Sequence, residues 1–387
     1  MILVETVNIP VEPQITEYLH AKAAHFHVPL NGTFELTPVC NMACKMCYVR
    51  MTQAQQEAIS PLRTADEWLA LGREAKERGL LYLLLTGGEP FVRPDLREIL
   101  TGLHRLGLIV SINTNGTRID ESVVGWLKET PPARMNITLY GASDETYARL
   151  CGNPQGFTQV TRAIRLLQEA GITIKLNCSL TPHNAHDLDA IMAYAKENGL
   201  LVQATSYMFP PLRRDASLVG QNDRFSPEEA AYWAARIESL MNGEERFVER
   251  MKENTILSLP AENGEDCPVL DEQGEGIRCR AGKCSFWVTW DGHLLPCGML
   301  PHQSELNVFE VGFDKAWQQA ISVASAIRLP AACKSCPLQS TCKSCAAMVL
   351  TESGRYDVVP DYRCRMTKAY PAACQQVVDE IISKRGL

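Results

Sequence analysis

The chain has 387 residues, of which 45% are hydrophobic and 21% are charged, a composition typical of a globular protein with a large core. Its formal charge of −7 gives no basic surface for nucleic acid, and no apolar run reaches the roughly 18 residues that a membrane span needs. The acidic N-terminus lacks the basic region of a signal peptide, so we expect a cytoplasmic protein without nucleic-acid or membrane partners.

Short apolar runs alternate with stretches of helical period between residues 33 and 206. Six strands are expected, at FELTP, LYLLLTGG, LIVSINTNG, MNITLYG, ITIKLNCSL and LVQATSYM, with helices between them near residues 64–79, 95–106, 120–129, 157–170 and 185–199. Strands that alternate with amphipathic helices form right-handed βαβ units around a parallel sheet. The prediction is an α/β fold, a partial (β/α)6 barrel of the TIM type, with its chemistry at the carboxyl ends of the strands.

The other segments flank this barrel, which is expected to span residues 33–206. Residues 1–32 are an N-terminal extension, and residues 207–260 are a bridge whose long helix begins at Ser226 and extends to about Met251. Residues 261–374 are rich in glycine and cysteine with little periodicity, as in a domain held by metal rather than by a packed core. A C-terminal tail, residues 375–387, completes the chain.

Fifteen cysteines are present, and ten of them lie between residues 267 and 374. The cytoplasm keeps thiols reduced, and a core of this size needs no disulfides, so metal or redox chemistry is the better explanation. Cys40, Cys44 and Cys47, directly after the first strand, have C-x3-C-x2-C spacing. Three thiolates are one ligand short of a closed zinc site, whereas a [4Fe–4S] cluster would keep one iron open. A zinc site completed by a distant His or Cys is the alternative.

With the aromatic Tyr48 directly after the third cysteine, the motif resembles the signature of the radical S-adenosylmethionine (radical SAM) superfamily. In that family, the amino and carboxylate groups of S-adenosylmethionine (SAM) bind the open iron. The resemblance implies that the TGGEP segment, with Gly87, Gly88 and Glu89, holds the methionine amine. Without the cysteines, this segment would be read as an ordinary turn.

Two further cofactor contacts are implied by the same resemblance. Thr138 stands where the family usually has a ribose-contacting serine, and Arg162, in the following helix, is the candidate for contact with the methionine carboxylate. The NTNGT segment, residues 113–117, either lines this pocket or is a plain turn. Cys151 and Cys178 are expected to be small buried side chains rather than ligands.

The C-terminal cysteines resemble the SPASM extension of radical SAM enzymes, which carries two auxiliary [4Fe–4S] clusters. By that resemblance, one cluster takes Cys279, Cys284, Cys297 and Cys345, and the other takes Cys333, Cys336, Cys342 and Cys364. The spacing of Cys342 and Cys345 departs by one residue from the common pattern, so Cys267 is an alternative to Cys279. Two zinc ribbons are another interpretation, because C-x2-C pairs suit zinc. Cys374 is not expected to be a ligand.

The resemblance implies an oxidoreductase with SAM, three [4Fe–4S] clusters and a low-potential electron donor such as flavodoxin or ferredoxin. Reductive cleavage of SAM would give a 5′-deoxyadenosyl radical, which abstracts a hydrogen from the substrate, so no catalytic side chain is assigned beyond the cluster. Ordinary surface or loop roles are expected for Asp215, Asp291, His293 and His302.

Enzymes with the SPASM extension mostly modify peptides or proteins, so the expected activity is maturation of a ribosomally synthesised peptide by a crosslink or another oxidation. Formylglycine formation, as in sulfatase maturases, is less favoured because Gly298 occupies the position of their usual aspartate. A dehydrogenase or rearrangement enzyme acting on a small molecule is an alternative, and a non-catalytic zinc scaffold is a weaker one. Arg213 and Arg214 would suit peptide carboxylates, although a solvated loop is expected there.

Overall fold

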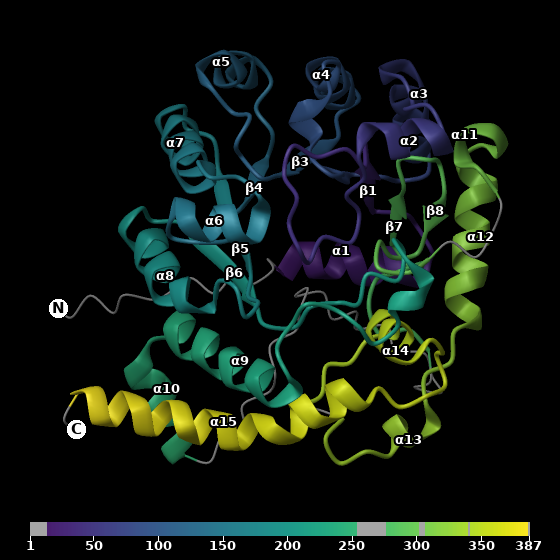
Figure 1. Cartoon of the computed structure of the whole chain (residues 1–387). Coiled ribbons are helices and arrows are strands. Elements are labelled where there is room, and N and C mark those ends of the chain that lie inside the picture. The colour runs from purple at the N-terminus through teal and green to yellow at the C-terminus, as the bar shows by residue number, and fades with distance from the viewer. Residues whose placement is uncertain (1–13, 254–275, 302–305, 340, 386–387) are drawn as a thin grey trace.

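The computed structural model describes residues 14–253, 276–301, 306–339 and 341–385. Six parallel strands follow one another in the order β6-β5-β4-β3-β2-β1 across a single sheet (Figure 1). Their bounds are β1 Asn31–Glu35, β2 Tyr82–Thr86, β3 Ile109–Thr114, β4 Arg134–Thr138, β5 Ile174–Ser179 and β6 Leu201–Thr205. The predicted partial barrel is confirmed, because consecutive parallel neighbours are what repeated βαβ units produce.

The helices between the strands form an arc around the sheet (Figure 1). The five that the sequence predicts are α3 Ala65–Glu77, α4 Leu96–Arg105, α5 Glu121–Glu129, α7 Gly156–Glu169 and α8 Leu188–Glu197. Two further helices, α2 Gln53–Ile59 and α6 Asp144–Cys151, and two 3₁₀ turns, η1 Pro90–Val92 and η2 Ala185–Asp187, lie in the loops after strands. Periodicity did not reveal α2 and α6 because each has only about two turns.

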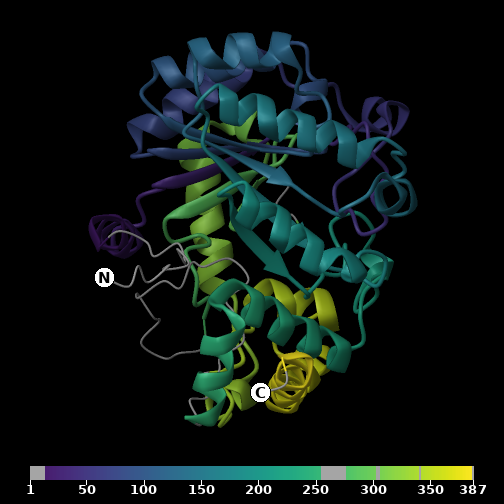
Figure 2. The ribbon, with the colours of Figure 1, turned by 90° about the vertical axis from the view of Figure 1, so that its left-hand side faces the viewer.

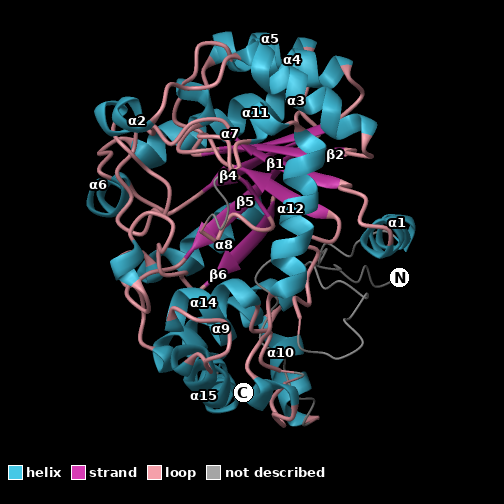
Figure 3. Cartoon of the chain, turned by 90° about the vertical axis from the view of Figure 1, so that its right-hand side faces the viewer, coloured by secondary structure: helices cyan, strands magenta, loops and turns pink. Residues whose placement is uncertain are grey.

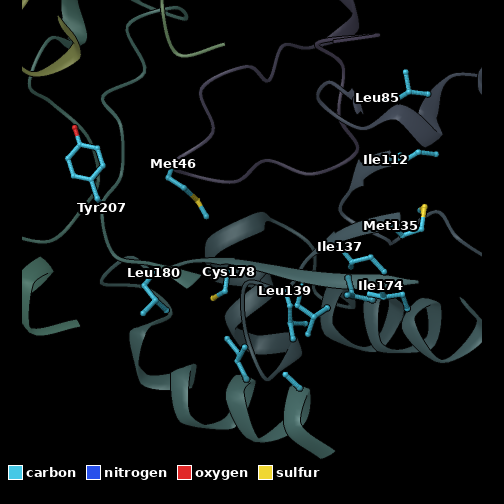
Figure 4. Close-up of a cluster of buried hydrophobic side chains, with 14 of the residues drawn as sticks. Met46, Leu85, Ile112, Met135, Ile137, Leu139, Ile174, Cys178, Leu180 and Tyr207 are labelled. Carbon is cyan, nitrogen blue, oxygen red and sulfur yellow. The ribbon is translucent and has the colours of Figure 1, made fainter. Parts of the chain in front are cut away.

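The two faces of the strands differ in polarity. Alternate side chains on one face are buried in the core, and Figure 4 shows Ile112, Met135 and Ile137, all fully buried, in this cluster. The intervening side chains on the inner face are polar: Asn136 Nδ2 donates to Asn113 Oδ1 at 2.8 Å, and Lys175 Nζ donates to Gln203 Oε1 at 2.6 Å. The outer face therefore stabilises the barrel, and the inner face provides hydrogen-bonding groups.

Two more strands extend the sheet beyond β1, and the sequence did not predict them. β7, Ser285–Val288, pairs in parallel with β1, and β8, Leu294–Leu295, pairs antiparallel with β7. Both are too short for a clear pattern of alternation. The cysteine-rich part of the chain thus shares a sheet with the barrel, and α12, Phe313–Ala326, packs beside α3.

The remaining helices lie mostly at the end of the molecule opposite α3–α5 (Figures 2 and 3). Ser226 caps α9 as predicted, but the expected helix is divided at Gly243 into α9 and α10. α15 packs along α9 and runs across the expected boundary at residue 374. The bounds are α1 Gln14–His25, η3 Ala216–Leu218, α9 Pro227–Asn242, α10 Glu244–Lys252, α11 Val308–Val311, α13 Ala331–Lys334, α14 Ala346–Ser353 and α15 Asp361–Arg385. Among the described residues, no helix is both long and apolar enough to cross a membrane.

Candidate functional site

The three leading cysteines lie in a loop at the carboxyl end of β1. Its two ends are joined by a β-bridge between Val39 and Met51, and Cys47 N donates to Cys44 O at 3.1 Å. Cys40, Cys44 and Cys47 are free thiols and are half-buried. The loop therefore closes on itself and holds three sulfurs at the strand end where barrel chemistry occurs.

Backbone and side-chain N–H groups point at two of these sulfurs. Met42 N lies 3.4 Å from Cys40 Sγ, Arg50 N lies 3.3 Å from Cys47 Sγ, and Asn115 Nδ2 lies 3.7 Å from Cys40 Sγ. Such donors stabilise a thiolate. Burial nevertheless raises the pKa of Cys40 to about 12, so without a metal the thiol keeps its proton. Asn115 also places the NTNGT segment beside the cysteines, as one of the two interpretations of that segment expects.

Gly87 and Gly88 allow the chain after β2 to approach this loop closely. Gly88 N donates to Thr37 O at 2.6 Å, and Glu89 N donates to Val39 O at 3.0 Å. A Cβ on Gly87 would lie 2.3 Å from Thr37 O, and one on Gly88 would lie 2.4 Å from Val39 O. Only glycine fits these two positions, so the GGE segment fixes the cysteine loop through backbone hydrogen bonds.

Glu89 is fully buried and connects the carboxyl ends of β2 and β3. Its carboxylate accepts hydrogen bonds from Asn115 N at 2.7 Å, Thr114 Oγ1 at 2.8 Å and Phe91 N at 3.0 Å. Burial outweighs these donors and raises the pKa of Glu89 to about 6. These contacts place Glu89 beside Cys40, while its contact with the methionine amine stays a prediction.

The two other candidate cofactor contacts, Thr138 and Arg162, differ in their position relative to the cysteine loop. Thr138 lies at the carboxyl end of β4, opposite Asn177 of β5, whose buried Oδ1 has no hydrogen-bond partner in the described structure. Arg162 is instead exposed on α7 and forms an ion pair with Glu121 of α5 at 2.5 Å. The structure does not bring Arg162 to the cysteine loop, because α6, which the sequence did not reveal, is the helix that follows Thr138 directly.

A buried arginine joins the cysteine loop to the C-terminal part of the chain. Arg213 donates to both carboxylate oxygens of Glu35 at 3.0 Å and to Gly298 O at 2.6 Å, and its guanidinium carbon lies 5.9 Å from the centroid of the Tyr48 ring. Arg214 donates to Cys47 O at 2.7 Å. The expectation of a solvated loop is wrong for Arg213, whose side chain is only 12% exposed.

Sequence reasoning missed Glu35, which is the centre of that contact. It is 1% exposed on the inner face of β1 and also accepts a hydrogen bond from Trp287 Nε1 at 2.9 Å. A charged residue inside the short apolar run FELTP was the available signal, since buried carboxylates need a partner. Its partners lie far along the sequence, so the pattern alone could not identify them.

Four of the C-terminal cysteines are neighbours. Burial, together with the nearby Cys342 and Cys336, raises the pKa of Cys333, and burial with Cys342, Cys333 and Cys336 raises that of Cys364. Cys364 lies in the first turn of α15, and its neighbour Arg363 is fully buried. The structure therefore brings together the set assigned by resemblance to the second auxiliary cluster.

The other set is only partly together. Cys279, Cys297 and Cys345 pack against one apolar cluster that includes Ile277. Cys284 is instead fully buried in a cluster with Ala23, Ala24 and Leu30. Cys267 and His302 lie outside the described residues.

The candidate ligands are all cysteine thiols, and thiolates select zinc or iron–sulfur clusters. The three thiols after β1 would leave one iron of a [4Fe–4S] cluster open, whereas a closed zinc site needs four ligands. The cysteine sets fit a cluster with SAM beside it, and so does the close approach of the GGE segment to the loop of residues 39–51 that carries the three cysteines, called the rim loop from here on.

Comparisons with known proteins agree with this fit. Residues 34–195 match the family model described as the radical SAM superfamily. The AdoMet-dependent heme synthase of Methanosarcina barkeri is 27% identical over 346 residues, which are 84% of this chain and 93% of that protein. The mycofactocin maturase MftC of Mycobacterium ulcerans is 26% identical over 363 residues, 90% of this chain and 91% of that protein. Streptococcus suis SuiB, in its crystal structure with the precursor peptide SuiA, shares the fold with a TM-score of 0.66 at 18% identity, over 90% of this chain and 79% of that chain.

Proposed function

Because the chain belongs to the radical SAM superfamily, we propose that Cys40, Cys44 and Cys47 hold a [4Fe–4S] cluster whose open iron binds SAM. The single observation that carries this assignment is the rim loop, where three half-buried thiols lie within reach of N–H donors and beside the GGE backbone. When bound, the cluster and SAM together supply a 5′-deoxyadenosyl radical for hydrogen abstraction. The protein's part is to position these groups and the substrate and to exclude water.

We further propose two auxiliary [4Fe–4S] clusters in the C-terminal region. The mutual proximity of Cys333, Cys336, Cys342 and Cys364 supports one of them. The packing of Cys279, Cys297 and Cys345 around one apolar cluster supports the other, with Cys284 as the predicted fourth ligand. Arg213 would hold the rim loop and Gly298, next to Cys297, in fixed positions.

The proposed substrate is a ribosomally synthesised peptide. MftC is a maturase by name and SuiB is seen with a precursor peptide, and both cover about nine tenths of this chain. The amides of Asn113, Asn136 and Gln203 on the inner face suit the N–H and C=O groups of a peptide backbone. Because a heme synthase is also similar to this chain, a small-molecule substrate is the second candidate.

A sulfatase-maturase-like reaction is less favoured for a steric reason. A Cβ on Gly298 would lie 2.5 Å from the indole ring of Trp287, which is itself hydrogen-bonded to Glu35. An aspartate at this position would therefore displace Trp287. The position at which sulfatase maturases usually have an aspartate therefore has no room for that side chain in this chain.

The test is anaerobic reconstitution followed by metal analysis and product analysis. We expect about twelve irons per chain, because three clusters have four irons each, and release of 5′-deoxyadenosine from SAM with dithionite or reduced flavodoxin. The triple variant Cys40→Ala/Cys44→Ala/Cys47→Ala should keep about eight irons per chain and release no 5′-deoxyadenosine. Zinc without acid-labile sulfide, or iron-loaded protein that never cleaves SAM, would contradict the proposal.

The substrate class needs a separate experiment. A short peptide encoded beside the gene, co-expressed with the enzyme, should lose two hydrogens by mass spectrometry if a crosslink or dehydrogenation forms. An unchanged peptide mass with retained SAM cleavage and no epimerised residue would shift the proposal to a small molecule. Cytoplasmic localisation and a flavodoxin-like or ferredoxin-like electron donor stay predictions, the former because fifteen cysteines favour a reducing compartment.

A further inference from the structure

The rim loop exposes one side of its chain. Asn41, Ala43 and Lys45 are exposed, whereas Met42 and Met46 in the same loop are buried. The three cysteines of the loop are half-buried. Another protein that touches the exposed side would therefore lie within a few residues of the thiols proposed to hold the cluster.

Exposed basic side chains lie on and around this loop, and we call them the basic patch: Lys45, Arg118, Arg149 and Arg214. Lys45 belongs to the loop itself. Its backbone N–H donates to Leu150 O at 3.1 Å, which places it beside the last turn of α6. Arg149 is in that turn, and its side chain is 52% exposed. Two cations thus meet where the rim loop contacts α6.

The other two members of the basic patch contact the loop from different segments. Arg214 donates to Cys47 O at 2.7 Å, so its guanidinium lies directly on the loop. Arg118 follows Thr117, whose hydroxyl accepts a hydrogen bond from Asn41 Nδ2 at 2.8 Å. The four cations therefore come from four segments that converge on the rim loop.

Most of this positive charge is not neutralised. Within the residues that the structure describes, Lys45, Arg118 and Arg214 form no ion pair. Arg149 has one, with Glu145 at 3.8 Å, and both side chains are exposed. Such a pair is weak and leaves the arginine available to a partner.

The acidic residues nearby are engaged elsewhere. The rim loop itself contains no Asp or Glu. Asp120 accepts a hydrogen bond from Val123 N at 2.9 Å and so caps α5, and Asp215 accepts from Ser217 N at 2.9 Å and Ser217 Oγ at 2.7 Å. A local excess of positive charge thus surrounds the loop in a chain whose formal charge is −7.

We propose that the basic patch is the docking surface for an acidic one-electron donor protein of the flavodoxin type, which reduces the cluster through the rim loop. This inference rests on the cluster proposed at Cys40, Cys44 and Cys47. The donor loses one electron and the cluster gains it, and no proton or bond is exchanged. Opposite charges steer such an encounter and raise its rate. A peptide substrate must instead reach the inner face of the strands, whereas these cations surround the loop.

The first test measures the rate of electron transfer in a stopped-flow instrument. Reconstituted enzyme is mixed without oxygen with reduced flavodoxin, and formation of the flavin semiquinone is followed. The variant Lys45→Glu/Arg149→Glu should lower the second-order rate constant about tenfold or more at low ionic strength, because steering is lost. Lys45→Gln/Arg149→Gln should lie between this variant and the wild type. Added salt should slow the wild type more than either variant.

Two controls show whether the effect belongs to docking. Lys128→Glu/Lys196→Glu makes the same change of charge in the last turns of α5 and α8, which lead to the amino ends of the next strands, opposite the rim loop. It should leave the rate constant nearly unchanged. Photoreduced deazariboflavin, a small uncharged reductant, should reduce the clusters of the wild type and of all variants at similar rates.

The outcomes separate this inference from the function on which it rests. If deazariboflavin reduces no SAM-responsive cluster in the wild type, the proposed cluster itself fails. If the cluster is present but the charge-reversed variant accepts electrons from flavodoxin as fast as the wild type, the docking surface is overturned. A variant slowed equally with both reductants would also overturn it, because the change would then act on the cluster. So would unchanged reduction by flavodoxin with weaker binding of the peptide encoded beside the gene, since the patch would then bind substrate.

Cross-linking gives a second readout that needs no electron transfer. A carbodiimide joins a lysine to a carboxylate that touches it, so oxidised flavodoxin and cluster-loaded enzyme should become linked through Lys45. Mass spectrometry of the digested product identifies the lysine. Lys128 and Lys196 should form no link, and high salt should reduce the yield at Lys45. Links confined to lysines outside the basic patch would overturn the proposed surface.

Discussion

Glu89 is a fully buried carboxyl group with a pKa raised by burial from its ordinary value of 4.5 to about 6. Between these two values the folded protein binds more protons than the unfolded chain, so the free energy of unfolding falls as pH rises through this window. The full effect is about 2 kcal/mol, at 1.36 kcal/mol per unit. The carboxyl group at the candidate site thus makes the metal-free fold less stable at neutral pH.

The measurement is urea unfolding of metal-free wild type and Glu89→Gln between pH 4 and pH 7. The stability of the wild type relative to the variant should decrease across pH 4.5–6. Glu121→Gln is the control: the ion pair with Arg162 lowers the pKa of Glu121, but the pair is exposed, so any change in stability should be small and of opposite sign. That pair stabilises the fold above the ordinary pKa, and its contribution is lost as pH falls. A pH-independent difference for Glu89→Gln would contradict the raised pKa.

Gly88→Ala tests the close approach of GGE to the rim loop. A Cβ there would lie 2.4 Å from Val39 O and 2.6 Å from Pro38 O, so the backbone must move. We expect a loss of about 3 kcal/mol in unfolding free energy, as for other severe backbone clashes, and at least a severalfold loss of iron bound at the first cluster. Gly125→Ala is the matched control, because its Cβ would meet nothing within 4 Å in the middle of α5. It should stabilise slightly, and equal effects of the two substitutions would contradict the steric argument.

At the scale of elements, local pattern determined what the sequence could predict. The six strands and five long helices of the barrel were predicted because each has several turns or a clear apolar run. The cysteine motifs were equally visible because their spacing is local. α6 and β7 were missed because they are short, and missing α6 led to the assignment of Arg162 to the cofactor pocket. The contacts of Glu35 with Arg213 and Trp287 were not predictable, since they join three distant segments.

The Glu35–Arg213 pair is expected to be important for joining these elements. Removing one partner leaves a buried charge without compensation, so Arg213→Ala should lower the unfolding free energy by about 3–5 kcal/mol. Arg213→Lys keeps the charge but cannot reproduce the forked contact with the carboxylate and Gly298 O. Its unfolding free energy should therefore lie between those of the wild type and Arg213→Ala. The double variant Glu35→Gln/Arg213→Met should regain much of the loss.

Urea unfolding of the metal-free variants measures this effect, and Arg162→Ala is the control. Its ion pair with Glu121 is exposed, so its removal should leave the unfolding midpoint nearly unchanged. A small effect of Arg213→Ala, similar to that of the control, would contradict the structural role of the buried pair. So would a double variant as unstable as Arg213→Ala alone.

At the scale of the whole molecule, the barrel and the cysteine-rich region share one sheet. The sequence suggested two main parts because its cysteines and its periodicity change near residue 261. The structure instead places β7 on the edge of β1 and packs α12 beside α3. Such pairing forms only when distant segments meet, so neither composition nor local period reveals it.

We expect the two regions to unfold as one cooperative unit, and Phe286 of β7 is the side chain best placed to test this. It is 3% exposed, its ring centroid lies 5.0 Å from that of Phe313 in α12, and a Cβ on Gly32 of β1 would lie 2.6 Å from it. Phe286→Ala should lower the unfolding free energy by about 3–5 kcal/mol, as for other buried aromatic residues.

Hydrogen exchange followed by mass spectrometry should show that Phe286→Ala loses protection in β1, β2 and α12 together, because we expect these elements to open as one unit. Phe157→Ala, at the half-buried contact of α7 with Tyr194, should lose protection only locally. If Phe286→Ala exposed α12 while β1 and β2 kept their protection, the two regions would be independent, and the rim loop could not rely on the C-terminal region for its position.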